Sequence, residues 1–268
     1  QYPYFLRPEN FENLFICRDG DRVVTHVGEL PEVASFFGDR VEMGMIGAVA
    51  SHPDYRGQGL ATKTLEIAFQ KTRERGGRLM MISGARGLYK RNGARSVGTF
   101  PEYEGAVDEL HPHIDKELTL ERVESAEAGR LGTLQRRKGF RFVRPREQWR
   151  LRMERGFCRD RNADFWMVCR GGADVAYIII GSAKDEENAD LVIECGGAPA
   201  AAVWGAVELA RNRGSATLHW APYEHERELQ QALDVAGFVA CGDRAMEGTQ
   251  RILNLPGVAR DLRGYFGE

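Results

Sequence analysis

The sequence contains no hydrophobic run that could cross a membrane. The longest purely apolar stretch lies near residues 175–180, whereas a spanning helix needs about 20 consecutive apolar residues. An excess of one charge is also absent, because 37 Lys and Arg stand against 39 Asp and Glu, for a net charge of −2 over 268 residues. Such a chain has no global positive field to attract nucleic acid or a lipid surface. We therefore expect neither a membrane nor a nucleic-acid partner.

Cysteines in a pairing pattern are missing as well. The five cysteines, Cys17, Cys158, Cys169, Cys195 and Cys241, are odd in number and have no C-x-x-C spacing. This pattern argues against a disulfide framework or a zinc site, so no metal is expected, and it favours reduced thiols in a cytoplasmic protein. The chain also lacks an initial Met and a recognisable signal peptide, so the sequence leaves open whether its beginning is missing.

One stretch, residues 46–64, combines a strand, a glycine-bearing loop and the start of a helix. The apolar run 46–50 predicts a strand, residues 51–55 form a polar turn, and apolar residues at helical spacing predict a helix over 60–75. Glycines let the backbone approach a ligand closely, and the unpaired N–H groups of a first helical turn point at an anion. The loop of this predicted anion site consists of Arg56, Gly57, Gln58, Gly59, Leu60 and Ala61.

Three families of phosphate-binding loop come into question, and two of them do not fit. A P-loop needs a Lys-Ser/Thr pair after its last glycine, where this chain has Leu60-Ala61. A dinucleotide fingerprint needs three glycines and a later acidic residue, and the loop has Gly57 and Gly59. The third pattern, R/Q-x-x-G-x-G/A, is matched with Gly59 and Ala61 in the small positions. With Arg56 and the preceding strand, this stretch resembles the GNAT superfamily of acetyl-CoA-dependent N-acetyltransferases.

The resemblance implies a mixed α/β (α+β) sheet, and the rest of the first half agrees with that fold class. Asp19-Gly20 lies between two alternating runs, 14–17 and 22–27, and predicts a hairpin. A second pairing is expected between residues 33–37 and 40–49. Further elements are expected as a buried strand at 78–83, a short helix at 88–91 and a strand at 94–99. Compared with a GNAT fold, the usual first strand and two helices would be absent from the start of this domain.

The second half repeats landmarks of the first. Cys17 and Cys169 lie in similar hairpin sequences at an offset of 152 (169 − 17), and Arg75-Gly76 matches Arg213-Gly214 at an offset of 138 (213 − 75). The later copy is thus 14 residues shorter (152 − 138), and residues 195–199 (CGGAP) replace the glycine loop. Such repetition indicates duplication of one α/β unit; the alternative is chance similarity of two hairpins. We expect the second copy to be degenerate and to have lost acetyl-CoA binding.

Two tandem GNAT domains and a tail are therefore expected, at residues 1–114, 115–250 and 251–268. Segment 117–123 would be the first strand of the second copy, and segments 126–138 and 145–155 its two helices. This region is rich in arginine, which could bind RNA or an acidic peptide. Because glutamates are interleaved with the arginines, we favour a solvated helical face.

By resemblance, acetyl-CoA is the co-substrate. Its diphosphate would bind the N–H groups of the loop at the positive end of the helix. Its pantetheine arm would pair with the end of the preceding strand, where that strand splays from the next one. The cofactor-binding residues implied are Val49, Ala50, Ser51, Arg56, Gly57, Gln58, Gly59, Leu60, Ala61 and Ser83.

Tyr89 is the expected catalytic residue. The segment 88–93 (LYKRNG) resembles the short helix in which a GNAT tyrosine approaches the CoA sulfur and acts as general acid. A phenol of pKa about 10 stays protonated near neutral pH and can donate to a thiolate. The alternative is a core tyrosine without a chemical role. No general base stands out among the residues; Glu42 and His52 are open choices, and proximity alone supplies much of the rate.

More narrowly, the motifs and the degenerate second copy resemble the tandem GNAT proteins related to the enhanced-intracellular-survival acetyltransferases. This resemblance implies transfer of an acetyl group from acetyl-CoA to a primary amine of a small molecule or peptide, with Tyr89 as general acid. The alternative from another class is a non-catalytic acetyl-CoA-binding sensor or scaffold. The identity of the acceptor, the general base and the formation of a homo-oligomer stay open.

Overall fold

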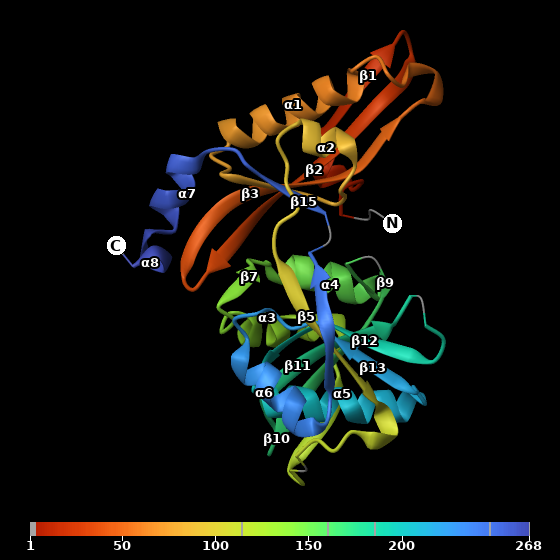
Figure 1. Ribbon diagram of the computed structural model, residues 1–268, viewed down its shortest axis with the longest axis vertical. Helices are drawn as coiled ribbons and strands as arrows, with labels where there is room; N and C mark the ends of the chain where they lie inside the picture. Colours follow the sequence, from red (N-terminus) through yellow and green to blue (C-terminus); the bar gives the residue numbers. More distant parts are fainter. Residues whose placement is uncertain (1–3, 114, 160, 185, 247, 268) are drawn as a thin grey trace. The chain divides into compact units, whose positions relative to one another are not determined.

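The computed structural model describes residues 4–113, 115–159, 161–184, 186–246 and 248–267. The chain divides into two compact units (Figure 1). Unit 1 consists of Gln1–Gly98, Gly139–Val143 and Ala245–Glu268, and unit 2 consists of Thr99–Lys138 and Arg144–Arg244. The chain therefore passes between the units after residues 98, 138, 143 and 244, and not at the boundaries expected near residues 114 and 250.

Unit 1 is built on a mixed sheet. Its strands lie in the order β1 (Leu14–Asp19), β2 (Arg22–Phe36), β3 (Asp39–Ser51), β4 (Leu79–Ile82) and β15 (Thr249–Ile252), with β7 (Phe140–Phe142) paired to the end of β2. Strands β3 and β4 run parallel, and the other neighbours run antiparallel. The predicted mixed α/β fold class is confirmed.

The helix α1 (Leu60–Glu74) packs on this sheet through the face that the sequence predicted. Its buried residues recur at helical spacing: Thr64, Leu65, Ala68, Phe69 and Thr72. Leu65 and Phe69 share one apolar cluster with Ile46 of β3 and Ile82 of β4. The shorter helices of unit 1 are η1 (Pro8–Asn13), η2 (Pro53–Tyr55), α2 (Gly87–Arg91), α7 (Leu255–Asp261) and α8 (Arg263–Phe266).

Strand β2 differs from the prediction. The sequence indicated two short strands, 22–27 and 33–37, and the structure has one strand of 15 residues. Gly28, ordinarily a weak strand residue, lies inside it and pairs with Gly47 of β3. Phe5 packs on this pair, since a Cβ built on Gly47 would lie 2.8 Å from the Phe5 ring. An aromatic ring from a distant segment thus fills the space that the two glycines leave.

A buried carboxylate joins α1 to the sheet. Glu29 on β2 has an exposed fraction of 0%, and its Oε1 accepts hydrogen bonds from Thr72 Oγ1 at 2.6 Å and from the Arg75 guanidinium. Arg75 also donates to Asn13 Oδ1 at 3.1 Å. A buried carboxylate is costly unless it is paired and hydrogen-bonded. These contacts therefore fix the C-terminal end of α1 over the sheet.

Unit 2 contains a second mixed sheet. Its strand order is β14 (Val239–Ala245), β5 (Thr99–Ala106), β13 (Thr217–Trp220), β12 (Ala189–Gly197), β11 (Ala173–Ser182), β10 (Asp164–Arg170) and β6 (Leu118–Arg122). The other elements are η3 (Val107–Glu109), η4 (Ser125–Glu127), α3 (Gly129–Gln135), α4 (Arg146–Glu154), α5 (Pro199–Arg213), α6 (Arg227–Ala236) and the small pair β8 (Phe157–Cys158) and β9 (Arg161–Asn162).

Alternate residues of β11 belong to different apolar clusters, so both faces of this sheet are covered. Ile178 and Ile180 pack in the cluster that contains α5 and α6, while Tyr177 and Ile179 pack in the cluster that contains α3 and α4. The predicted first strand and two helices of the second copy are confirmed as β6, as η4 with α3, and as α4.

Each sheet is completed by a strand from a distant part of the chain. Strand β5 directly follows the part of unit 1 that ends at Gly98, yet it pairs with β13 in unit 2. Strand β15 follows the last strand of unit 2, and it pairs with β4 in unit 1. The strand predicted to start within 94–99 starts at its last residue, as β5 from Thr99. Before it the structure has an isolated bridge between Arg95 and Gln250, and β15 occupies the edge of β4.

The hairpins β1–β2 and β10–β11 show the repeat and correct its register. Both contain a shift in pairing, followed by the pairs Arg18↔Val23 and Cys169↔Asp174. Gly20 and Gly171 in the two turns have the same φ of 55°. The structural offset is 151 (171 − 20), not 152. A slip of one residue moves a side chain to the other face of a strand, so the two matched cysteines are not equivalent.

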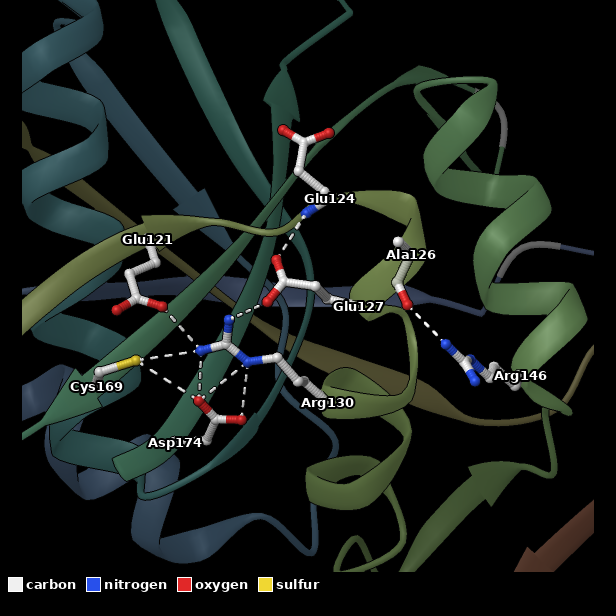
Figure 2. A network of polar contacts seen from close by, with 8 residues as sticks. All are labelled: Glu121, Glu124, Ala126, Glu127, Arg130, Arg146, Cys169 and Asp174. Atoms are coloured by element: carbon white, nitrogen blue, oxygen red, sulfur yellow. Dashed lines mark hydrogen bonds and ion pairs between the residues drawn. The ribbon is translucent and has the colours of Figure 1, made fainter. Parts of the chain in front are cut away.

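Arg130 on α3 links that helix to the sheet of unit 2 (Figure 2). It donates to Asp174 at 2.6 and 3.0 Å, to Glu121 at 2.8 Å and to Glu127 at 3.0 Å. The guanidinium holds the pKa of the Asp174 carboxyl below its usual range. Burial and these carboxylates raise the pKa of the adjacent Cys169 thiol to about 11, so this cysteine is a poor nucleophile.

An arginine of α4 is also paired with carboxylates. Arg150 donates to Glu154 at 2.6 Å and to Glu147 at 2.6 and 3.0 Å. These contacts within one helix are those that the interleaved glutamates predicted. None of the helices in the described ranges has the length and hydrophobicity of a membrane-spanning segment.

We expect Glu29→Gln to lower the free energy of unfolding by about 1–3 kcal/mol, because the amide keeps the shape but loses the charge that Arg75 and Thr72 bind. Urea denaturation followed by circular dichroism measures the change. The matched control is Glu66→Gln on the exposed side of α1, which bonds Arg73 and should cost less than about 1 kcal/mol. Equal effects of the two variants would contradict the assignment of Glu29 as a core anchor.

The lowered pKa of Asp174 predicts a pH dependence of stability. A carboxyl group with a depressed pKa in the folded state stabilises the protein above its unfolded-state pKa, and this contribution is lost as the pH falls below about 4. Asp174→Asn should therefore be less stable than the wild type near neutral pH, and the difference should shrink in acid. Asp21→Asn, at an exposed ion pair with Arg18, serves as control. A difference between wild type and Asp174→Asn that is independent of pH would refute this explanation.

Candidate functional site

The glycine loop lies between β3 and α1, as the sequence predicted. Gly57 and Gly59 have φ values of 79° and 76°, in the left-handed region that glycine adopts without strain. Gly59 is the N-cap of α1 and no side chain caps the helix. The N–H groups of the first turn have no partner within the helix, and residues 56–59 are exposed. The loop therefore presents main-chain donors and the positive end of a 15-residue helix to a ligand.

Side chains tie this loop to the tip of the β1–β2 hairpin. The Tyr55 hydroxyl donates to Asp19 Oδ2 at 2.6 Å, and Arg22 Nη2 lies 2.5 Å from His52 Nε2. His52 Nδ1 accepts from the Asp54 N–H at 3.3 Å, so its ring caps η2. Both ring nitrogens of His52 are thus engaged in holding the turn, which favours a structural role over that of a general base.

Strand β4 pairs with β3 over a short length and ends before β3 does. Their register runs from Met43↔Leu79 to Ile46↔Ile82, and the Ser83 N–H donates to Ile46 O at 3.0 Å. Strand β3 continues through Ser51, beyond the last of these pairs. The part of β3 beyond its pairing with β4 therefore includes Val49, Ala50 and Ser51. Ser83 lies directly after the end of β4. We call the side of β3 that β4 no longer covers, beyond the pair Ile46↔Ile82, the β3–β4 gap.

A bulge interrupts β3 at the start of this gap. The pairing with β2 passes from Gly28↔Gly47 to His26↔Ala50, so β3 has one extra residue there. Ala48 has a φ of 52°, which is uncommon for a residue with a side chain. The Ala48 carbonyl lies 2.7 Å from His26 Nδ1. This bulge could not be predicted from the sequence, because a left-handed bulge position normally carries glycine and this one carries alanine.

Tyr89 lies on α2 and is buried, with an exposed fraction of 4%. It belongs to the same apolar cluster as Ile46 and Ile82, the last pair before β3 and β4 separate. Its ring also lies 3.2 Å from a Cβ built on Gly84. The structure thus brings Tyr89, the end of β4 and the part of β3 beyond its pairing with β4 into one region of unit 1. A core role and a chemical role both fit this placement.

Unit 2 also has a strand that extends past its parallel neighbour, but it lacks the glycine loop. Strands β12 and β13 pair from Ala189↔Thr217 to Val192↔Trp220, and β12 continues through Gly197. A single residue, Ala198, then leads into α5, which begins with Pro199. Proline has no N–H, and the Ala198 N–H donates to Val175 O at 2.8 Å. This helix start therefore offers no loop of free donors to an anion.

Lys138 lies beside the part of β12 that extends past its pairing with β13. Its Nζ donates to Cys195 O at 2.8 Å and lies 2.6 Å from Glu226. Burial opposes its charge, yet the pKa of Lys138 lies above its usual value because Cys195, Glu226 and Glu194 are close. The main chain of β12 beyond its pairing with β13 is thus bound by the chain's own ammonium group.

A buried ion pair adjoins this lysine. Glu194 accepts from Arg144 at 2.7 Å and from the Tyr177 hydroxyl at 2.8 Å. Burial raises the pKa of Glu194, but Arg144 outweighs it and brings the value to about 2. These contacts satisfy a charged group in the core of unit 2 and leave its carboxylate ionised.

No group of three or more potential metal ligands occurs among the residues that the structure describes. A cavity of about 780 Å³ is present in unit 2, where Arg122, Asp164 and Arg213 contribute to its lining. Asp164 pairs with both arginines, at 2.9 and 2.7 Å. None of the predicted site residues lines this cavity.

Residues 4–104 match the model of a protein family described as an acetyltransferase (GNAT) domain. No curated protein sequence matches the chain. Among solved structures, a GCN5-related N-acetyltransferase from Kribbella flavida is similar, with 18% identity and a TM-score of 0.67 over 90% of this chain and 60% of that chain. Eis1 from Mycobacterium abscessus is similar with 15% identity and a TM-score of 0.70, over 95% of this chain and 69% of that chain.

The N-myristoyltransferase of Saccharomyces cerevisiae with bound myristoyl-CoA has 10% identity and a TM-score of 0.55, over 92% of this chain and 72% of that chain. At these identities the structures show the fold alone, and the chain spans less than two thirds of the Kribbella protein. The family expected from the loop is confirmed for residues 4–104, which match the GNAT acetyltransferase domain.

Proposed function

We propose that the protein is an N-acetyltransferase that moves the acetyl group of acetyl-CoA to a primary amine. The observation that supports this most is the placement of the glycine loop and the free start of α1 next to the β3–β4 gap. One end of the site can bind a diphosphate, and the other end offers strand edges to an extended arm.

The ligand would lie along β3. The main-chain N–H groups of Gln58, Gly59, Leu60 and Ala61 bind the diphosphate, while Arg56 and Gly57 shape the loop. The pantetheine arm pairs with Val49, Ala50 and Ser51, in the manner of a peptide strand added to a sheet edge. Ser83, after the end of β4, borders the other side of the gap.

The reaction follows from this placement. A neutral amine attacks the thioester carbon, a C–N bond forms, and the carbonyl oxygen takes up negative charge. The intermediate collapses as the C–S bond breaks, and the sulfur leaves as a thiolate that Tyr89 protonates. The acceptor nitrogen loses its proton to solvent or to a base. The acceptor is a small molecule or a peptide with a primary amine.

Unit 2 does not take part in binding acetyl-CoA in this proposal. Its counterpart of the loop is reduced to Ala198, and Lys138 occupies the main-chain acceptor at Cys195 that an incoming arm would need. The chain then binds a single molecule of acetyl-CoA, in unit 1.

Gly59→Ala should weaken CoA binding by about tenfold or more, because a side chain disfavours the left-handed conformation at the N-cap. Isothermal titration calorimetry measures the dissociation constant and the stoichiometry, which should be one CoA per chain. Gly76→Ala is the matched control, since Gly76 lies at the other end of α1 with a φ of 89° and open space at its Cβ position, as at Gly59. Equal affinities of the two variants, or two bound CoA molecules per chain, would contradict the proposed site.

Tyr89→Phe should lower kcat by about 10²- to 10⁴-fold, the usual contribution of a general acid, with little change in CoA affinity. Thiol release from acetyl-CoA across a panel of amines measures the rate, and Tyr265→Phe on the exposed α8 is the control. If the wild type binds CoA but releases thiol with none of the amines, the protein is a sensor or scaffold rather than an enzyme.

A further inference from the structure

Ala48 adopts a left-handed conformation within β3 that glycine would adopt with less strain. Ala48 has a φ of 52°, and residues with a Cβ rarely adopt this region outside turns. Strained main-chain conformations persist where the surrounding structure holds them, and they concentrate at functional sites.

His26 holds the turn. Its Nδ1 lies 2.7 Å from Ala48 O, and because a carbonyl oxygen only accepts, Nδ1 carries the hydrogen. His26 is on β2, in register with Ala50 on the far side of the bulge. The imidazole thus fixes the direction of the peptide group between Ala48 and Val49.

The direction of that peptide group decides where the Val49 N–H points. In a trans peptide the carbonyl and the following N–H point in opposite directions, so the Val49 N–H points away from His26. Strands β2 and β4 flank β3 on its two sides, and the pairing of β3 with β4 ends at Ile46↔Ile82. The bulge therefore lies where β3 has just lost its partner on the side of the gap.

We propose that His26 is a positioning residue for acyl transfer: it holds the bulge so that the Val49 N–H is directed at the carbonyl oxygen of a thioester in the β3–β4 gap. This inference rests on the proposed function. During attack by an amine the negative charge develops on that oxygen, and a preorganised donor stabilises it. His26 itself touches neither the acyl group nor the amine, and it acts through the main chain.

The test compares His26→Ala, Ala48→Gly and the double variant, with His219→Ala in unit 2 as control. His26→Ala should lower kcat by about 10- to 100-fold and leave the affinity for CoA unchanged, because the diphosphate loop is intact. The double variant should recover much of the rate, since glycine adopts the left-handed conformation without support from the imidazole. A histidine needed only for stability would give no such rescue of kcat.

A second readout does not depend on the acceptor. The wild type should bind acetyl-CoA more tightly than CoA, because only acetyl-CoA has the carbonyl oxygen that the Val49 N–H would bind. His26→Ala should lose this preference, and the double variant should regain it. Calorimetry with CoA and acetyl-CoA measures both constants. If His26→Ala does not fold, the double variant alone decides: a retained preference supports the inference and a lost preference overturns it.

The outcomes separate this inference from the proposed function. If the wild type binds neither ligand, the proposed function fails and this inference with it. If the wild type binds both with equal affinity, or if His26→Ala keeps the preference and the rate, the role of His26 is refuted while the acetyltransferase proposal stands.

Discussion

The short parallel pairing of β3 with β4 is the constraint on which the arrangement of unit 1 depends. Between Met43↔Leu79 and Ile46↔Ile82 the strands are bonded to each other, and beyond Ile46 the main chain of β3 must find other partners on that side. The bulge, the glycine loop and the start of α1 all follow this point in the chain. Because Ile46 and Ile82 also pack with Tyr89, the end of the pairing and the position of that tyrosine are set together.

In unit 2 the strand that extends past its parallel neighbour is bound by a side chain of the same unit. There β12 also extends past its last pair with β13, but its free carbonyl at Cys195 accepts from Lys138. A buried ammonium needs anionic partners, and Glu226 and Glu194 provide them. In unit 2 the chain's own ammonium group binds the extended part of β12, whereas we propose that a ligand binds the corresponding part of β3 in unit 1. Loss of the loop and closure of the gap are therefore consistent with each other.

Local features of the chain were predictable where they depend on local patterns. The helix α1 and the loop before it follow from apolar spacing and from Gly57 and Gly59, and both were found where expected. The bulge at Ala48 could not be foreseen, because alanine gives no signal for a left-handed conformation that a histidine on another strand supports. The continuity of β2 was missed for the same kind of reason, since the ring that covers Gly28 and Gly47 comes from Phe5.

The sequence by itself determined the GNAT motif, the mixed fold class, the position of the glycine loop and the absence of that loop from the second copy. These depend on residues that are neighbours along the chain, so spacing and composition reveal them. The tertiary structure alone decided that β5 completes the sheet of unit 2 and β15 that of unit 1, that Lys138 meets Cys195, and that His26 meets Ala48. Such contacts join segments far apart in the sequence, and many segments compete for each strand edge. Only the packing of the whole chain selects which of them binds there.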